Sequence, residues 1–153
     1  YLASDRDPAV VGKWRKAGKP IYFGDARREA YLRSCGIDDA SAIIITIHTQ
    51  PEIDEIVRAA RRLRPGLPII SRARDAAHAR HLYDLGVDDA VPETIEASLQ
   101  LAEAALVSLG EPMGRVIAAI HEERDVVRRD LQGAAAKSGK TPILKSRTPA
   151  RSS

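Results

Sequence analysis

Residues 42 to 52 of the chain read Ala42-Ile43-Ile44-Ile45-Thr46-Ile47-His48-Thr49-Gln50-Pro51-Glu52. The first six form an aliphatic, β-branched run that is typical of a buried strand. Thr49 and Glu52 have the spacing of a capping box, which predicts that a helix begins directly after the strand. A strand followed at once by a helix is the repeating unit of a parallel sheet covered by helices. The apolar residues that follow share one face of that helix: Ile53, Ile56, Val57, Ala60 and Leu63.

The same strand-and-helix unit recurs on both sides of this stretch. Asp7-Pro8 is typical of a helix cap followed by proline at the first helical position, and Gly18 closes that helix. Asp75 caps a later helix that Gly86 ends. Residues 1–110 are therefore predicted to form one α/β domain. Its expected strands are residues 1–5, 20–23, 42–47, 67–70 and 89–91, and the helices between them cover residues 8–17, 27–35, 50–64 and 76–85.

A weak internal repeat supports this reading of the chain. Residues 32–40 are echoed by residues 82–90, and each copy contains a helix end, a glycine, a turn and the entry to a strand. Asp38-Asp39 and Asp88-Asp89 are thus candidates for an acidic or metal site. We favour polar turns, because both pairs precede strands, whereas ligands gather at the carboxyl ends of strands.

The segment after the last strand has a different pattern. Apolar residues spread around much of the helix from Glu93 to Leu109, which predicts either a contact with a second subunit or burial beneath the next helix. That next helix is expected from Arg115 to Leu131 and belongs to a segment of residues 111–132. Residues 133–153 are expected to be a disordered basic tail.

The charge distribution argues against a nucleic-acid-binding domain. The net charge is +3, but the tail contains five basic residues and no acidic one, which leaves residues 1–132 at −2. The longest aliphatic run is far shorter than the roughly 20 residues that a membrane span requires, so we expect this chain to be soluble. Cys35 is the only cysteine, which excludes an intrachain disulfide.

Candidate ligand-binding residues follow the strands. Asp5, at the end of the first strand, has a residue type and position suited to ribose hydroxyls. Gly24 and Ala26 leave room for an adenine ring, and Asp25 is placed to hydrogen-bond its edge. The alternative for both aspartates is a local Asx-turn. His48 lies at another strand end and is a candidate ligand contact.

Arg72 and Arg74 follow the fourth strand and suit an anionic ligand, since a guanidinium binds carboxylate or phosphate through two hydrogen bonds. The alternative is an ion pair with Asp75, Glu93 or Glu96. We predict no catalytic residue and no metal site, because Cys35 has no histidine near it in the sequence. His78 and His81, one helical turn apart, are expected to be a surface pair.

Four stretches together resemble the cytosolic nucleotide-binding domain of Kef-type potassium-efflux cation:proton antiporters, which belongs to the regulator-of-potassium-conductance, or Trk-N, group. The resemblance covers about residues 1 to 110. It implies a Rossmann-like parallel sheet with helices on both faces, and a regulatory role without catalysis. The stretches are Ser4-Asp5-Arg6-Asp7-Pro8, Tyr22-Phe23-Gly24-Asp25-Ala26, Ile69-Ile70-Ser71-Arg72-Ala73-Arg74-Asp75 and Val91-Pro92-Glu93-Thr94-Ile95-Glu96-Ala97-Ser98-Leu99.

By this resemblance the domain follows a membrane antiporter domain, lies at the cytoplasmic face of the bacterial inner membrane and forms a homodimer through the Glu93 to Leu109 helix. The resemblance also implies NAD(H) or AMP as the bound nucleotide. Arg72 and Arg74 are implied contacts of glutathione, the gating ligand of the Kef branch. The implied adenosine contacts are Asp5, Arg6, Gly24, Asp25, Ala26, Ile47 and His48.

The sequence departs from this family in two places. The first strand and its glycine loop are expected to be missing before Tyr1, together with the pyrophosphate site and its helix dipole. An open gap in the sheet is then expected. His48-Thr49 stands where relatives often have an acidic pair. Two alternatives remain: a remnant of an NAD(P)-dependent oxidoreductase and a ligand-free dimerisation module.

Overall fold

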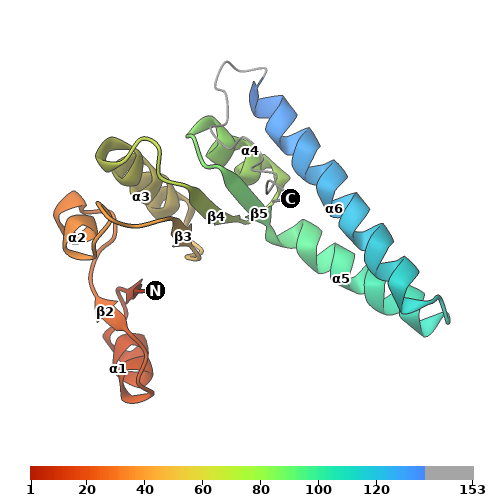
Figure 1. The fold of residues 1–153 in the computed structure, drawn as a ribbon, viewed down its shortest axis with the longest axis horizontal. Helices are drawn as coiled ribbons and strands as arrows, with labels where there is room; N and C mark the ends of the chain where they lie inside the picture. Colours follow the sequence, from red (N-terminus) through yellow and green to blue (C-terminus); the bar gives the residue numbers. More distant parts are fainter. Residues whose placement is uncertain (137–153) are drawn as a thin grey trace, which may run out of the picture.

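The computed structural model describes residues 1–136. Strands and helices alternate as far as α5, which confirms the predicted α/β class (Figure 1). Every strand pairing in this part of the chain is parallel. The elements are β1 (Ala3–Asp5), α1 (Pro8–Lys16), β2 (Ile21–Phe23), α2 (Glu29–Ser34), β3 (Ile43–Ile45), α3 (Gln50–Leu63), β4 (Ile69–Ala73), α4 (Ala76–Asp84), β5 (Asp89–Pro92), α5 (Glu93–Ser108) and α6 (Met113–Ala136).

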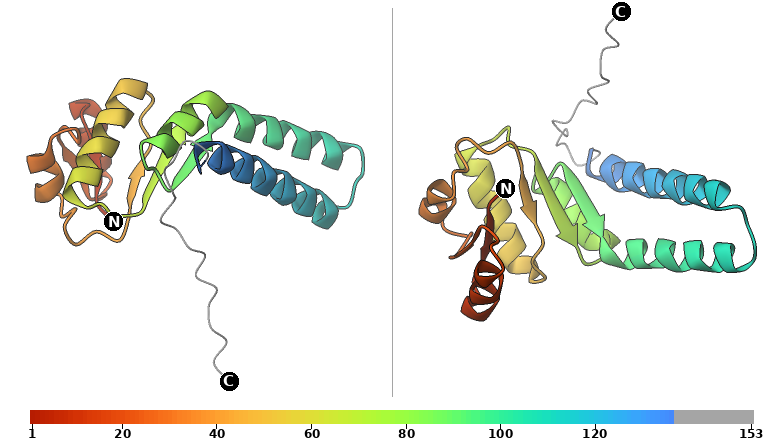
Figure 2. Two further views of the ribbon diagram at one scale, coloured as in Figure 1. Left: turned by 90° about the horizontal axis from the view of Figure 1, so that it is seen from above. Right: turned by 60° about the horizontal axis from the view of Figure 1, so that its bottom comes forward.

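The strands form two separate sheets. β1 pairs with β2, and β3, β4 and β5 form a second sheet in that order. Ile43 lies opposite Ile69, and Ala73 lies opposite Pro92. β1 and β3 are not paired within the described chain, so the expected gap in the sheet is present; the two-stranded sheet and α1 lie at one end of the molecule (Figures 1 and 2).

Side chains from α2 and α3 join the two halves. Arg62 of α3 forms an ion pair with Glu29 of α2 at 2.6 Å. Arg64 donates hydrogen bonds to the carbonyls of Ile37, Asp38 and Ala40 in the turn after α2. Leu32 and Ile37 also belong to the main core, so polar contacts and apolar packing both hold α2 and its following turn against α3.

The main core lies between the three-stranded sheet and helices α3 and α4. Ile69 and Ala73 of β4 pack against Ile53 and Val57 of α3 and Leu82 of α4, and all are buried. The face of α3 predicted from its periodicity is the buried one. A hydrophobic stripe on each helix, matched to alternate residues of β4, thus accounts for the fold of this half.

The predicted aspartate caps are present, but the predicted capping box before α3 does not form. The carboxylate of Asp7 accepts the Ala9 N–H at 2.8 Å, and that of Asp75 accepts the His78 N–H at 2.9 Å. Thr49 precedes α3 without a side-chain hydrogen bond to it. The reciprocal partner of the predicted capping box, Glu52, instead uses its carboxylate for an ion pair with an arginine of a distant segment.

The internal repeat is a structural feature. Gly36 and Gly86 have φ values of 83° and 93°, a conformation that favours glycine and ends a helix. Asp88 is buried, and one of its carboxylate oxygens accepts both the Ile69 N–H and the Arg61 guanidinium at 2.7 Å. Asp88 therefore has a structural role, in which it joins the turn after α4 to β4 and α3.

α5 and α6 form an antiparallel hairpin that extends away from the sheet (Figure 1). A small second core of Leu99, Val116 and Ile120 holds it together. α6 is longer than the predicted helix at both ends and includes residues 133–136, which were assigned to the tail; residues 137–153 of that tail lie outside the described part. Within residues 1–136, no helix combines the length and apolarity that crossing a bilayer demands.

Candidate functional site

An open cavity of about 500 Å³ lies where β1 and β2 end and α3 begins. The carboxyl ends of the strands and the N-terminus of α3 meet at this cavity, because parallel strands place their carboxyl ends at one edge of a sheet. The gap between the two sheets adjoins this edge. The lining residues are Ser4, Asp5, Arg6, Asp7, Pro8, Gly24, Asp25, Ala26, Arg27, Ile47, Glu52 and Ile56.

The structure brings together most of the residues proposed for nucleotide binding. Asp5, Arg6, Gly24, Asp25, Ala26 and Ile47 all line the cavity. His48, Arg72 and Arg74 are not among the lining residues. Six of the predicted nucleotide contacts therefore lie around one cavity, whereas His48 contacts Arg72 in a neighbouring cluster.

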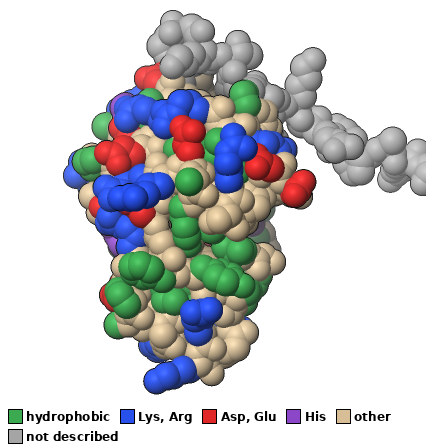
Figure 3. All heavy atoms as spheres, turned by 90° about the vertical axis from the view of Figure 1, so that its left-hand side faces the viewer, with side chains coloured by type: hydrophobic (Ala, Val, Ile, Leu, Met, Phe, Trp, Pro, Cys, Tyr) green, Lys and Arg blue, Asp and Glu red, His purple; other side chains and the backbone are tan. Residues whose placement is uncertain are grey.

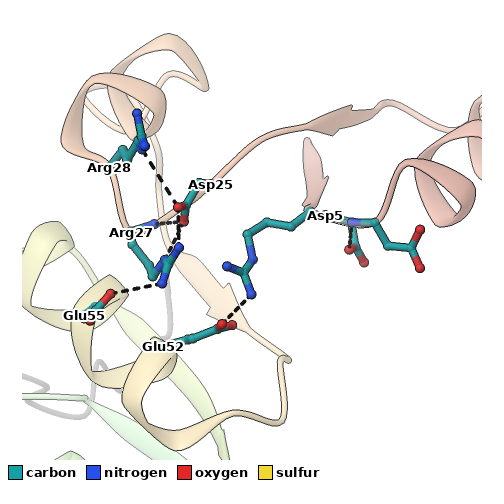
Figure 4. Close-up of polar contacts among 8 residues, drawn as sticks. Asp5, Asp25, Arg27, Arg28, Glu52 and Glu55 are labelled. Atoms are coloured by element: carbon teal, nitrogen blue, oxygen red, sulfur yellow. Dashed lines mark hydrogen bonds and ion pairs between the residues drawn. The ribbon is translucent and has the colours of Figure 1, made fainter.

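Asp5 and Arg6 line the cavity at the end of β1, and Figure 4 shows Asp5 on this side. One carboxylate oxygen of Asp5 accepts the Asp7 N–H at 2.8 Å, which is the Asx-turn alternative. The backbone carbonyl of Asp5 accepts the Gly24 N–H at 3.0 Å and ties β1 to the turn after β2. Arg6 forms an ion pair with Glu52 from the first turn of α3. This contact links the end of β1 to helix α3 across the cavity.

Asp25 and Arg27 form the opposite wall (Figure 4). The Arg27 guanidinium donates to both oxygens of Asp25, at 2.8 and 2.7 Å, and the Arg27 N–H donates at 3.1 Å. These hydrogen bonds favour the charged carboxylate and lower the pKa of Asp25 from 3.8 to about 2. Arg27 also lies 3.6 Å from Glu55. Asp25 is therefore ionised at neutral pH and already holds a cation.

Gly24 makes room for Tyr31 of α2. A Cβ atom at Gly24 would overlap the Tyr31 ring, so the space that the glycine leaves is filled by this side chain. The Tyr31 hydroxyl lies 2.9 Å from the Ser4 hydroxyl, and partial burial raises the pKa of Tyr31. The predicted contact of Gly24 with adenine stays a prediction. Ala26 retains the small side chain that such an approach requires.

A second polar cluster lies at the ends of β3 and β4. Arg72 donates to the Thr46 carbonyl at 3.2 Å, lies 3.1 Å from a ring nitrogen of His48, and forms an ion pair with Glu93. Arg74 pairs with Asp75 at 2.9 Å. The ion-pair alternative thus holds for both arginines. A bound anion would have to replace Glu93 and Asp75.

The two histidines of α4 differ from the predicted surface pair. His78 is buried, its Nδ1 accepts the Arg74 N–H, and burial lowers its pKa. His81 is exposed and lies 2.7 Å from Asp54 of α3. The prediction failed for His78 because α3 covers that side of α4. Residues 1–136 contain no group of three or more His, Cys, Asp or Glu side chains arranged to bind a metal ion.

A smaller cavity of about 220 Å³ lies where the helical hairpin meets β5. Arg124 of α6 donates to both oxygens of Glu96 of α5, and this pairing raises the pKa of Arg124. Arg128 pairs with Asp89 of β5 at 2.7 Å. Charged groups of α6 therefore neutralise the acidic residues of this cavity and fix the base of the hairpin.

The main cavity has the donors and acceptors for a nucleoside. Its cations, Arg6 and Arg27, are each paired with an acidic side chain. Acceptor carboxylates, Asp5 foremost, suit the hydroxyls of a ribose, whereas a phosphate would compete with Glu52 and Asp25 for the guanidinium groups. The residues therefore fit the ribose and base of a nucleotide better than its phosphate.

Sequence reasoning missed Arg27 and Glu52 as lining residues. Arg27 stands two positions after Asp25, where a side chain can close a local ion pair. Glu52 was assigned to a helix cap instead. Its position in the first turn of the helix after β3 could have identified it, because that turn begins at the same sheet edge as the other site residues.

Comparisons with known proteins agree with this architecture. The family profile described as TrkA-N domain matches residues 1–93. The chain is 39% identical over 110 residues to "K(+) efflux antiporter 3, chloroplastic" of Arabidopsis thaliana, covering 72% of this chain and 14% of the relative. It is 32% identical over 139 residues to "Putative K(+) efflux antiporter KefB" of Alkalimonas amylolytica, covering 88% and 21%. The chain thus spans about a fifth or less of these relatives.

Solved structures show the same fold. The Kef C-terminal domain of Shewanella denitrificans in its AMP-bound form has a TM-score of 0.69 and 26% identity, and the match covers 89% of this chain and 97% of that domain. The TrkA-N domain of the inner membrane protein ybaL from Escherichia coli has a TM-score of 0.62 and 24% identity, covering 67% and 76%. The second match concerns the fold alone.

Proposed function

The chain belongs to the TrkA-N domain family, and from this premise we propose that it is a regulatory nucleotide-binding domain of a Kef-type potassium-efflux antiporter. The observation that carries the proposal is the cavity at the carboxyl ends of β1 and β2, which Asp5, Gly24, Asp25 and Ala26 line together. A relative of this fold that has been solved with AMP supports an adenine nucleotide, AMP or NAD(H), as the ligand class.

The proposed role of each side chain follows from its chemistry. Asp5 uses one carboxylate oxygen for the Asp7 N–H, and its second oxygen accepts a hydrogen bond from a ribose hydroxyl. Ala26 leaves room for the base beside the backbone. Arg6 sits next to Asp5 and exchanges Glu52 for a ligand oxygen. The domain performs no reaction on the nucleotide in this proposal.

Regulation requires that the nucleotide bind one state of the protein better than another. We place this difference in a homodimer formed through α5, on the cytoplasmic face of the bacterial inner membrane, next to the antiporter domain of the whole protein. Exposed apolar side chains on α5 support the dimer. Arg72 and Arg74 are the proposed contacts of an anionic thiol peptide such as glutathione.

Calorimetric titration with adenosine, AMP and NADH tests the ligand site. We expect adenosine and AMP to bind this chain with affinities within about a factor of ten, because each cavity arginine is held by an acidic partner and the gain from a phosphate is reduced accordingly. Asp5→Asn should weaken both by about tenfold, since it removes a charged hydrogen-bond acceptor. Asp39→Asn, a turn residue outside the cavity, is the matched control.

Two results would overturn the proposal. Absence of heat with all three ligands, in a sample shown to be folded by circular dichroism, would favour a ligand-free dimerisation module. If Asp5→Asn and Asp39→Asn change the affinity equally, the ligand does not bind in this cavity. A large preference for AMP over adenosine would contradict the nucleoside-centred description of the site.

A further inference from the structure

The segment formed by α1 and β2 is basic, whereas the described residues after it contain acidic and basic side chains in mixture. Lys13, Arg15, Lys16 and Lys19 lie between Asp7 and Asp25 with no acidic residue among them, in a chain of 24 basic and 21 acidic residues. We define the α1–β2 surface by these basic residues and the three exposed aromatic residues of the same segment. Its members are Lys13, Trp14, Arg15, Lys16, Lys19, Tyr22 and Phe23.

The aromatic members are exposed although α1 packs against the sheet. Val11 and Ile21 form the buried contact. Trp14, Tyr22 and Phe23 remain 44%, 45% and 60% exposed. Large apolar side chains gathered at one site commonly mark an interaction surface. Folding of the described residues therefore does not explain them.

Basic and aromatic side chains are interleaved on this surface. The Lys13 ammonium lies 5.6 Å from the centre of the Trp14 ring, and the Arg15 guanidinium lies 5.6 Å from the centre of the Tyr22 ring. Such contacts hold each cation beside an aromatic face. The charge and the apolar surface are therefore presented together.

The charge of this surface is not neutralised by neighbours. Among the described residues, the ion pairs to acidic side chains are made by other arginines and a histidine, and none involves Lys13, Arg15, Lys16 or Lys19. Figure 3 looks at this end of the molecule. Hydrophobic side chains gather in its lower half with basic ones beside and below them, whereas most acidic side chains in view lie higher.

We propose that the α1–β2 surface contacts the anionic lipid headgroups of a membrane. Lysine and arginine are attracted to a negatively charged leaflet, and tryptophan and tyrosine are enriched at the level of the headgroups. The inference rests on the proposed function, which keeps the domain beside a bilayer. The segment that carries this surface, α1 and β2, lies at one end of the molecule (Figure 1).

A lipid surface fits these residues better than a nucleic acid does. The described chain offers one short basic helix, and the net charge of residues 1–132 is negative, which disfavours the extended electrostatic footprint of a nucleic-acid-binding domain. An anionic leaflet attracts the α1–β2 surface, while the rest of residues 1–132, which has a net negative charge, faces away from the membrane. The charge asymmetry of the domain thus orients it on a membrane.

Trp14 provides a reporter inside the surface, because it is the only tryptophan of the chain. The whole chain is mixed with vesicles of phosphatidylcholine and phosphatidylglycerol, or of phosphatidylcholine alone. We expect the Trp14 emission to shift to shorter wavelength only with phosphatidylglycerol, as the indole leaves water. Raising the salt concentration should reverse the shift, because it screens the attraction.

Substitutions separate the contributions of the basic and the aromatic side chains to vesicle binding. Lys13→Gln/Arg15→Gln/Lys16→Gln should lower vesicle partitioning by roughly a hundredfold, at about fivefold for each charge. Phe23→Ala should lower it severalfold while keeping Trp14 and all charges. The control Arg80→Gln/Arg115→Gln/Arg129→Gln removes as many exposed charges from α4 and α6, and should leave partitioning nearly unchanged.

Three outcomes would overturn the inference. Sedimentation with vesicles without a Trp14 shift would assign binding to another part of the chain. Equal loss in the two triple variants would mean that only net charge matters. A Trp14 shift with a single-stranded RNA but not with vesicles would make the surface a nucleic-acid site. The nucleotide calorimetry contains no lipid, so it tests the proposed function independently of the vesicle experiments that test this inference.

Discussion

At the scale of single residues, the sequence predicts which side chains gather at one edge of the strands, but not which of them pair. Asp5 and Asp25 were selected because they follow strands, and both line the cavity. Arg6 pairs with Glu52, 46 positions further along the chain. Such a partner is set by how the elements pack. The spacing of residues along the chain does not predict this pairing, so the sequence analysis assigned Arg6 no acidic partner.

The Asp25–Arg27 ion pair should make the stability of the protein depend on pH. Its contribution to stability should be present above about pH 4 and disappear as the pH falls toward 2, because the folded state lowers the pKa of Asp25 from 3.8 to about 2. In Arg27→Gln the Asp25 pKa should rise toward its usual value, since the main hydrogen-bond donor is gone. Carboxyl carbon chemical shifts followed by NMR measure it directly.

Arg28→Gln is the control for that titration. Arg28 also faces Asp25, but at 4.0 Å and with a largely exposed side chain, so its removal should change the Asp25 pKa little. A similar rise in the Arg27 and Arg28 variants would mean that general charge, and not the hydrogen bonds of Arg27, lowers the Asp25 pKa.

At the scale of elements, helices were predicted more accurately than strands. The period of α3 and the aspartate caps of α1 and α4 depend on residues within the helix itself. β3 is limited to Ile43–Ile45, inside the apolar run of residues 42–47, because a strand ends where its neighbour stops pairing. α6 continues through Gly133, where packing of Leu131 on the main core outweighs the low helix propensity of glycine.

Helix α5 carries the prediction about the dimer. α6 buries Leu99, but Leu101 and Leu109 are 73% and 81% exposed, so a partner would cover the latter two. Leu101→Arg/Leu109→Arg should weaken self-association by roughly thirtyfold or more, because it places charges in an apolar interface. Sedimentation equilibrium over a range of concentrations gives the change.

Glu122→Arg introduces an arginine at an exposed position of α6 and serves as the control. The prediction fails if the wild-type chain is a monomer at every concentration, or if the control dissociates the dimer to the same extent. Leu99 is unsuitable for this test because its replacement would break the hairpin core itself. The sequence alone could not distinguish Leu99 from Leu101, since both lie on apolar stretches of one helix.

At the scale of the whole molecule, stability is distributed unevenly. The main core belongs largely to residues 43–90, whereas α1, β1 and β2 bury Val11 and Ile21. Where no strand pairing joins the two sheets, ion pairs and the packing of Leu32 and Ile37 in the main core connect the two parts. The order of the elements was readable from the sequence. The contribution of each part to the stability of the fold could not be predicted, because it depends on which strands pair.

Amide hydrogen exchange should reveal this division. We expect the amides of β1 and β2 to exchange at least about tenfold faster than those of β4, because fewer buried contacts resist opening of the two-stranded sheet. Mass spectrometry of peptides from each strand measures the ratio. Equal protection across both sheets would show that the molecule opens as one unit.

The long helix α6 gives the molecule a lever. Its 24 residues span about 36 Å, and its C-terminal half is fixed to the sheet through Leu131 and the Arg128–Asp89 ion pair. Its other end lies at the tip of the hairpin, far from the sheet (Figure 1). A tilt of about 10° about Leu131, roughly 27 Å from that tip along the helix, displaces the tip by roughly 5 Å. A slight readjustment at β5 is thereby magnified at the distal turn, Gly110 to Pro112.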